Sequence, residues 1–251
     1  YYSACRFDGR GCWVGKEGWR WRWTETKGGG ADVIERLTIP GLTDAEQLTL
    51  DECFAQLRAK VGINERRSCM FEGKYRARHL GISVPPQLER VETTLLWPAK
   101  AVEALESLIN LEGFVIPDGV AADFGVDKIW RQNRLSIEAT QAHTSALKYG
   151  VAFLAVMAGR PGEPDVVIRT LSPTSSTALW DANKRRVSAA LSITKTDKDF
   201  PTELILFLDN RVVTATKSGG VWNVSRVTHS LGRCPVSALP FKPSVEEPFG
   251  R

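Results

Sequence analysis

Residues able to do chemistry are few in this sequence of 251 residues, and they are scattered along it. His143 is followed by Thr144 and Ser145, but neighbours in a helix point in different directions, so this arrangement does not bring a base to a nucleophile. Asp123 and Asp127 lie one helical turn apart and could pair as acid and base or bind a metal ion. The helix dipole already explains acidic residues in the first turn of a helix. We therefore predict no catalytic residue.

Signatures of cofactor and metal sites are absent from the sequence. It contains no GxxxxGKS/T, no GxGxxG before a predicted helix, no HExxH and no GxSxG. Its five cysteines form no CxxC pair and no metal-ligand spacing, and we expect free thiols. His79 and His229 stand alone. We predict no cofactor, no metal and no enzymatic activity.

Basic residues gather in three segments, each of which could contact an anionic partner. Residues 19–23 read Trp-Arg-Trp-Arg-Trp, whose rings could stack on bases. Residues 184–186 read Lys-Arg-Arg, which is typical of a solvated hairpin tip. One predicted helix has a basic face that could meet phosphates or the acidic surface of a neighbouring subunit, although such a face is more often simply solvated. Its residues are Arg66, Arg67, Lys74, Arg76 and Arg78. The net charge of +4 is too small to indicate a nucleic-acid binder by itself.

The stretch 141–157 marks a change from helix to strand and is the junction around which the rest is organised. Alanines at three- and four-residue spacing, at 139, 142 and 146, predict a packed helix before it. Gly150 stands where a left-handed C-terminal cap needs a residue without Cβ. Val151 to Met157 are almost all apolar, which predicts a strand buried on both faces at the centre of a sheet.

The chain before this junction is predicted to be mainly helical. Thr43 and Glu46 form a capping-box pattern, and Asn64 is predicted to begin a second helix. Pro98 interrupts the pattern after Trp97, so we expect a bend there with Trp97 wedged into the core. The predicted helices cover residues 43–60, 64–79, 87–96, 99–110 and 123–133, with a strand at 111–116. Ser136 or one of its neighbours is predicted to cap the helix that ends at Gly150.

The chain after the junction is predicted to be rich in strands. Turn signals separate short runs that alternate between apolar and polar residues, which favours antiparallel hairpins with one solvated face. The predicted strands cover residues 166–171, 176–180, 186–194, 203–208, 211–217 and 221–227. Prolines at 240, 243 and 248 interrupt the last stretch.

These patterns predict an α+β fold in three parts. Residues 37–150 form a helical part, and residues 151–251 form a mainly antiparallel, β-rich part. Residues 1–36 differ from both, because half of the eight tryptophans lie there among arginines and glycines. One hypothesis is that residues 1–36 are not native protein but upstream nucleotides read through as protein. No apolar run reaches transmembrane length.

From residue 37 onward the sequence resembles the N-terminal portion of the portal proteins of tailed bacteriophages. The likeness is to the siphovirus head-to-tail connector family of actinobacterial phages and prophages, and it depends on the order and spacing of many small motifs. These are Leu80-Gly81-Ile82, Val84-Pro85-Pro86, Leu88, Trp97-Pro98, Ala99, Val102, Leu111-Glu112-Gly113-Phe114, Trp130, Asn133, Gln141-Ala142-His143-Thr144, Ala146, Leu147, Tyr149-Gly150, Ser172-Pro173, Trp180-Asp181, His229, Leu231-Gly232, Pro235-Val236 and Pro248-Phe249-Gly250-Arg251.

The resemblance implies a structural role. Portal subunits form a dodecameric ring at one capsid vertex, through which double-stranded DNA is packaged and ejected. The ring docks terminase, which supplies the ATPase, together with capsid, scaffold and head-completion proteins. The matching region implies the outer wing, and the expected stem, clip and crown lie beyond residue 251. It further implies location in the virion, and in the host cytoplasm during assembly, without a membrane.

Two other functions stay open at this point. The first is a DNA-binding module that uses the Trp/Arg segment 19–23. The second is an unrecognised enzyme centred on Asp123, Asp127 or His143, which would require a deep pocket that gathers those side chains.

Overall fold

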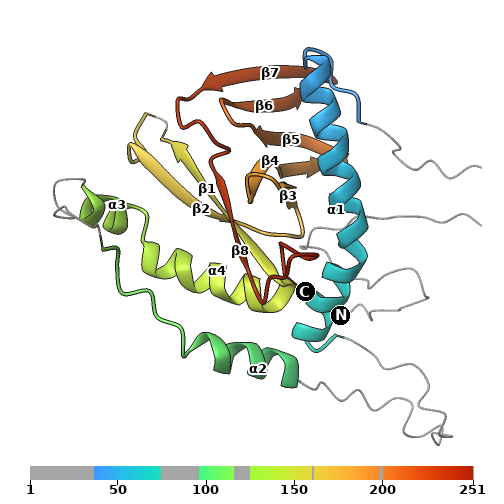
Figure 1. Ribbon diagram of the computed structural model, residues 1–251. Helices are drawn as coiled ribbons and strands as arrows, with labels where there is room; N and C mark the ends of the chain where they lie inside the picture. Colours follow the sequence, from blue (N-terminus) through green and yellow to red (C-terminus); the bar gives the residue numbers. More distant parts are fainter. Residues whose placement is uncertain (1–36, 75–95, 116–124, 160, 198–199, 251) are drawn as a thin grey trace, which may run out of the picture.

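The computed structural model describes residues 37–74, 96–115, 125–159, 161–197 and 200–250. These segments form helices and two antiparallel sheets (Figure 1), so the predicted α+β class is confirmed. The predictions for residues 1–36, for 64–79 beyond Lys74, and for 87–95 lie wholly or partly outside the described residues.

Helix α1 (Asp44–Phe71) is a single long helix that lies along the larger sheet. The Thr43 side chain accepts a hydrogen bond from the Glu46 backbone and the Glu46 side chain accepts one from Thr43, so the predicted capping box is confirmed. The predicted break at Asn64 is wrong. The Asn64 amide is buried and donates to the Pro173 carbonyl at 3.0 Å, so this residue makes a tertiary contact in mid-helix instead of capping a new one.

Eight strands form two sheets. Their bounds are β1 Val151–Ala158, β2 Val166–Leu171, β3 Ser176–Asp181, β4 Arg186–Asp197, β5 Phe200–Phe207, β6 Arg211–Ser218, β7 Val221–Thr228 and β8 Val236–Pro240. The smaller sheet has the order β2-β1-β8 and the larger has the order β3-β4-β5-β6-β7, with every pairing antiparallel. Strand β1 is therefore central, as predicted. Strand β8 was missed, because the flanking prolines indicated a loop.

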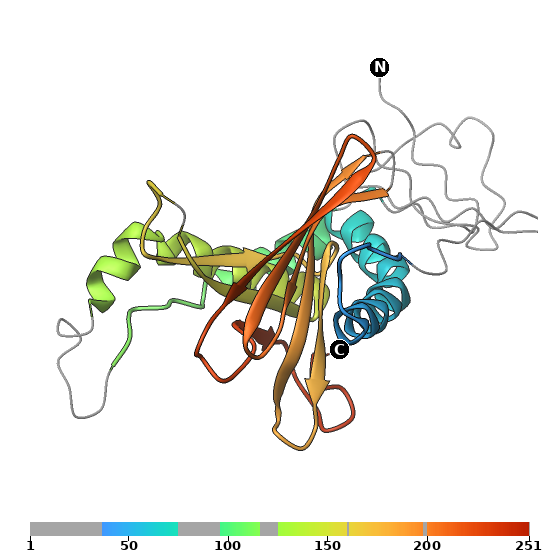
Figure 2. The same cartoon turned by 90° about the horizontal axis from the view of Figure 1, so that it is seen from above.

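Hydrophobic clusters hold these elements in layers (Figure 2). Leu50, Leu57 and Val61 of α1 pack on one face of the larger sheet, against residues such as Leu191 and Leu206. The other face of that sheet contacts the smaller sheet through a second apolar cluster, whose members include Phe153, Ala178, Ala190, Phe207 and Val236. Both sheets thus contribute to the core.

Helix α4 (Leu135–Tyr149) covers the smaller sheet. Its buried Ala142 and Ala146 pack against Ala152 of β1, and small side chains there let the helix approach closely. Gly150 ends the helix at φ 90°, in the left-handed conformation that was predicted. Ser136 itself does not cap the helix: the N-cap residue is Arg134, two positions earlier, and it makes no side-chain cap bond.

Helix α2 (Trp97–Glu106) and helix α3 (Val126–Gln132) lie at the edge of the molecule. Trp97 was predicted to be in the core, yet 75% of it is exposed. Proline occupies the second position of α2, where it starts the helix and does not bend a longer one. The predicted strand 111–116 is absent from its described part, residues 111–115.

Residues 241–250 return to the junction between α4 and β1. The Phe241 amide donates to the Gly150 carbonyl at 2.8 Å. A Cβ on Gly250 would lie 2.6 Å from that same carbonyl oxygen and 2.3 Å from the Phe241 oxygen, so only glycine fits this approach.

Candidate functional site

The predicted basic face of residues 66–78 divides into residues with different partners. Arg66 is exposed on α1. The Arg67 guanidinium donates to the Tyr149 carbonyl, so it links the end of α1 to the end of α4. Lys74 forms an ion pair with Glu72 at 2.6 Å. Arg76 and Arg78 lie outside the described residues. Among the residues of this basic face that the structure describes, Arg66 is therefore the one whose side chain is exposed and is not held by a hydrogen bond or ion pair.

The strongest electrostatic feature is a buried carboxylate at the start of α1. Only 1% of Glu46 is exposed, and its two oxygens receive Arg211 Nε at 2.8 Å and Arg226 Nη2 at 2.8 Å. Arg226 also donates to the Gly41 carbonyl. Hydrogen bonding from Arg226 is the main cause that lowers the pKa of Glu46 to about 2. This cluster fastens α1 to strands β6 and β7, and its groups are occupied with one another.

A hollow of about 460 Å³ lies between α1 and strands β1 and β3. Three of its polar side chains are already paired: Asn64 with the Pro173 carbonyl, Arg67 with the Tyr149 carbonyl and Lys60 with Glu247 at 3.9 Å. These three side chains therefore hold neighbouring elements together.

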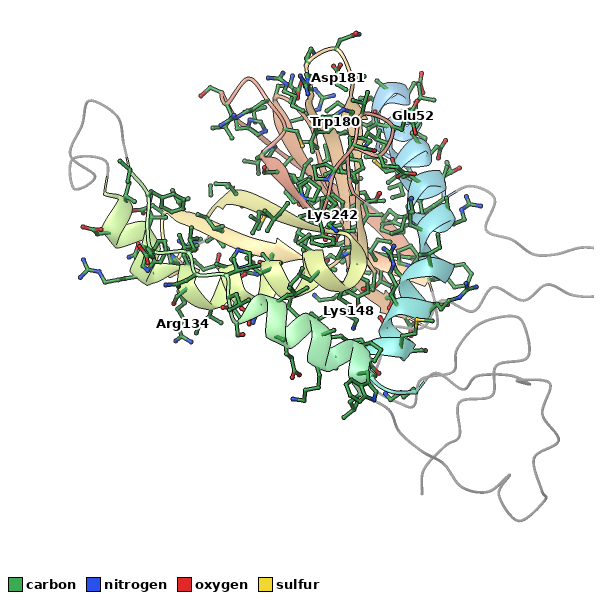
Figure 3. All side chains as sticks on the ribbon, turned by 60° about the horizontal axis from the view of Figure 1, so that its bottom comes forward. Glu52, Arg134, Lys148, Trp180, Asp181 and Lys242 are labelled. Atoms are coloured by element: carbon green, nitrogen blue, oxygen red, sulfur yellow. The ribbon has the colours of Figure 1, made fainter. Side chains whose placement is uncertain are left out.

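Phe249 also lines a second hollow of about 460 Å³, together with Glu52 and Trp180. Figure 3 labels the side chains of Glu52 and Trp180. The ring centroid of Phe249 lies 5.8 Å from that of Phe153 and 5.9 Å from that of Trp180, both edge-to-face. These contacts anchor residues 241–250 between α1 and the two sheets, so we interpret the hollows as packing gaps beside this segment.

The structure does not bring the candidate acid and base residues together in the part of the chain that it describes. Asp127 is exposed in the first turn of α3, and Asp123 lies outside the described residues. His143 is half-buried on α4, and its Nδ1 and the Ser145 hydroxyl are buried without a hydrogen-bond partner. Neither His143 nor Asp127 lines the two hollows.

The cysteine thiols in the core are poor nucleophiles. Burial raises the pKa of Cys53 and of Cys234 to about 12, so neither forms a thiolate near neutral pH. Both are free, as predicted, whereas Cys69 is disulfide-bonded, and for Cys69 the expectation of a free thiol is wrong.

The basic turn 184–186 joins β3 to β4. Lys184 lies 3.5 Å from Asp181, and Arg186 lies 3.6 Å from Asp209 and donates to the Gly232 carbonyl. Neighbouring acids thus offset part of its positive charge. The other basic segment, residues 19–23, lies outside the described residues.

The described part of the chain holds no group of three or more His, Cys, Asp and Glu residues placed to bind a metal ion. None of its helices combines the length and the apolarity that crossing a bilayer requires.

Comparison with known proteins decides the family. The model of the family described as phage portal protein, SPP1 Gp6-like, matches residues 55–242. The chain belongs to this portal family. The resemblance that the motifs indicated is thereby confirmed, and the match includes most of α1 and all of β1 to β8.

Curated relatives of this portal chain come from mycobacterial viruses. The portal proteins of Mycobacterium phage L5 and of Mycobacterium phage D29 are each 24% identical to it over 188 residues, which is 72% of this chain. The same stretch is 39% of each relative's length, so the chain spans about two fifths of the relatives that it matches.

The sequence did not predict two features of this portal chain. The pairing of Glu46 with Arg211 and Arg226 joins residues 165 and 180 positions apart, and no local pattern reveals such a contact. The second is the exposed side chain of Trp97 at the start of α2, whose apolar character favoured a place in the core.

Proposed function

We propose that the chain is part of a passive structural subunit of a portal ring at one vertex of a phage capsid. The family match over residues 55–242 is the observation that carries this proposal. In the proposal, copies form a dodecameric ring through which double-stranded DNA enters and leaves. Terminase supplies the ATP hydrolysis, and the ring also meets capsid, scaffold and head-completion proteins. The ring resides in the virion, after assembly in the host cytoplasm.

A non-enzymatic role agrees with the chemistry of the described residues. The buried Glu46 is neutralised by two arginines, the thiols of Cys53 and Cys234 are protonated, and three polar side chains of the hollow between α1, β1 and β3 are paired. Each of these features stabilises packing, which is what a shape-holding subunit requires.

The proposal also divides the chain. Residues 37–150 and 151–251 would be the helical and β-rich parts of the portal wing, leading toward a stem. Residues 1–36 precede the family match and would not belong to the wing.

A cyclic ring needs two different, complementary surfaces on each subunit. We extend the proposal to Arg66, which lies exposed near the end of α1, as a contact to an acidic surface of the neighbouring subunit. Lys74, Arg76 and Arg78 would belong to the same contact.

Immunogold labelling of purified phage particles tests the proposed place in the virion. Antibodies against the folded chain should label a single vertex, at the junction of head and tail, after mild opening of the capsid. Antibodies against the major capsid protein, as the control, should label the whole shell. Absence of the chain from particles, or label spread over the shell, would contradict the proposal.

A further inference from the structure

Strand β7 (Val221–Thr228) forms an open edge of the larger sheet. It is the last strand in the sheet order, and in Figure 1 it lies at the outer boundary of that sheet. The His229 amide donates to the Asn210 carbonyl at 2.9 Å, so the odd-numbered residues of β7 are the ones that hydrogen-bond to β6. The even-numbered residues turn their N–H and C=O groups the other way. Among the described residues, none hydrogen-bonds to these outward backbone groups at positions 222, 224 and 226.

The edge of the smaller sheet at β2 is closed by side chains. Asn133 donates to the Val166 carbonyl at 2.9 Å and accepts from the Ile168 amide at 2.8 Å. The Glu138 carboxylate accepts from the Thr170 amide at 2.9 Å. These bonds are made to the side of β2 that faces away from β1, so the two side chains occupy the place that another strand would take.

Two other edges carry protective features of their own. Strand β3 has a register shift between Leu179 and Trp180, and Trp180 packs against Phe249. Strand β8 has only five residues and ends at Pro240, which has no N–H to donate. Bulges, short strands and prolines are common means by which proteins prevent edge-to-edge pairing.

Strand β7 has none of these protections. Its eight residues pair with β6 without a register shift, and they include no proline. Arg226 is its only charged residue, and the guanidinium is bound to the Glu46 carboxylate at 2.8 Å and to the Gly41 carbonyl. Its charge is therefore neutralised by Glu46 instead of guarding the edge. A long, regular edge of this kind is a template for another strand.

The sequence of β7 is complementary to itself. If a second copy lies antiparallel with Val224 opposite its own counterpart, even-numbered residues oppose even-numbered ones, as the outward groups require. Val221 then lies opposite Val227 of the other copy, and Asn223 lies opposite its Ser225. Val221 is 65% exposed and Val227 is 60% exposed, so each such pair removes apolar surface from water. Asn223 and Ser225 supply a polar pair that can share a hydrogen bond.

The position of α1 is compatible with this arrangement. In Figure 1, α1 begins beside β7 and runs toward β3. A two-fold axis through Val224, perpendicular to the sheet, places both copies of α1 on the same face, where they extend in opposite directions away from the axis. The larger sheets of the two copies then join into one continuous sheet.

We propose that β7 binds a second copy of the chain edge to edge, through an antiparallel, two-fold β7–β7 pairing centred on Val224. Each hydrogen-bonded pair of residues across the axis exchanges two N–H···O bonds. An edge contact buries less than the ~800 Å² that each partner buries in a standard interface, so the association is weak and depends on concentration. Ring closure uses two different surfaces, whereas this contact uses one surface twice, so either proposal can fail without the other.

Sedimentation equilibrium of the 251-residue chain at increasing concentration tests the contact. The average mass should rise from the monomer value toward twice that value. Val221→Lys combined with Val227→Lys places like charges opposite each other at both ends of the pairing and should weaken it by roughly tenfold. Val245→Lys, at a position 98% exposed outside the sheets, is the control and should leave the association unchanged. A chain that stays monomeric, or one that grows beyond a dimer, would overturn the proposal.

A second double variant tests the register. Val221→Glu combined with Val227→Lys places opposite charges against each other twice across the axis, so this variant should dimerise about as well as the original chain. Weakening as large as that of the double-lysine variant would refute the register centred on Val224. Circular dichroism should show unchanged folding in all variants.

Amide hydrogen exchange distinguishes edge pairing from any other dimer. The amides of Trp222, Val224 and Arg226 should exchange quickly in dilute solution and more slowly at concentrations where the dimer forms, because they gain an acceptor only there. The amides of Asn223 and Ser225, which already bond to β6, should change little. A dimer in which the even-numbered amides exchange no more slowly than in the monomer would contradict pairing through β7.

Discussion

Glu46 shows how one residue can have a local and a long-range role. The sequence predicts that Glu46 completes a capping box with Thr43, and the structure confirms it. The same carboxylate also accepts hydrogen bonds from Arg211 and Arg226, which come from strands far along the chain. A buried carboxylate is stable only when its charge is paired in this way. Glu46 therefore fixes where the start of α1 lies on the larger sheet.

Acid should weaken the fold through Glu46. Its pKa is lowered from 4.5 to about 2 in the folded chain, so the stabilisation is complete above pH 4.5 and is lost as pH falls toward 2. Glu46→Gln should lower the free energy of unfolding at pH 7 by about 3 kcal/mol, because two arginines lose their charged partner. It should also flatten the dependence of stability on pH below 4.5. Urea unfolding at pH 7 and at pH 3 measures both effects.

Glu52→Gln is the matched control for this prediction. Glu52 lies exposed on the same helix (Figure 3), so its replacement should change stability by less than about 0.5 kcal/mol. If Glu46→Gln were as stable as this control, and as sensitive to acid as the original chain, the carboxylate would not anchor α1.

At the scale of elements, signals that depend on neighbouring residues were predictable. The change from helix to strand at Gly150 was predictable from three local signals: the helical spacing of alanines before it, the glycine itself and the apolar residues after it. The strands β2 to β7 were similarly recognisable from alternation and turn residues. These features fix the type of an element, but they do not say what it packs against.

Three of the wrong predictions involve contacts made at long range. Asn64 has the residue type of a helix cap, yet its amide reaches a carbonyl 109 positions later, and the helix continues through it. Trp97 is apolar enough for a core, but Ala99 and Val102 of the same helix face inward instead. Strand β8 is short and ends at a proline, and it forms because β1 provides a partner. Tertiary context overrode local propensity in each case.

Asn64→Ala tests whether the mid-helix contact stabilises the fold. The change leaves the Pro173 carbonyl without its donor in a buried place, so we expect a loss of about 1–2 kcal/mol in the free energy of unfolding. Alanine favours a helix more than asparagine does, and this partly offsets the loss. Urea unfolding monitored by tryptophan fluorescence measures the net change.

Gly62→Ala provides a control of opposite sign in the same helix. A Cβ at Gly62 meets no atom within 4 Å, so alanine should stabilise the chain by about 0.5–1 kcal/mol. An Asn64→Ala variant as stable as the original chain would mean that the bond to Pro173 contributes nothing beyond helix propensity.

At the scale of the whole molecule, the family could be inferred from the sequence, but its surfaces could not. The motifs that carried the resemblance include residues now seen at packing junctions: the Asn133 side chain bonds the Val166 carbonyl and the Ile168 amide of β2, and Phe249 is wedged against Trp180. Such positions define a fold. A surface residue such as Arg66 takes part in no such junction, and nothing in the local sequence says what it would contact.

The distribution of charge over the molecule predicts weak binding to duplex DNA. The net charge is only +4, and described basic side chains such as Lys74, Lys184 and Arg186 lie beside carboxylates. Few phosphates can then be neutralised, so few counterions are released and binding changes little with salt. Fluorescence anisotropy with a labelled 30-base-pair duplex should give an affinity weaker than about 1 µM at physiological salt, in the range typical of non-specific binding.

The same titration without residues 1–36 separates this prediction from a DNA-binding module. Tryptophans and arginines at 19–23 could stack on exposed bases, so any binding that they provide should vanish on deletion and should favour single strands. Submicromolar binding that persists after the deletion, with a steep dependence on salt, would contradict the passive role. It would place a true nucleic-acid surface on the folded part, because only a cluster of unpaired basic residues neutralises many phosphates at once. A conduit through which DNA must slide is better served by the opposite property, since tight contacts to phosphate would hold the DNA in place.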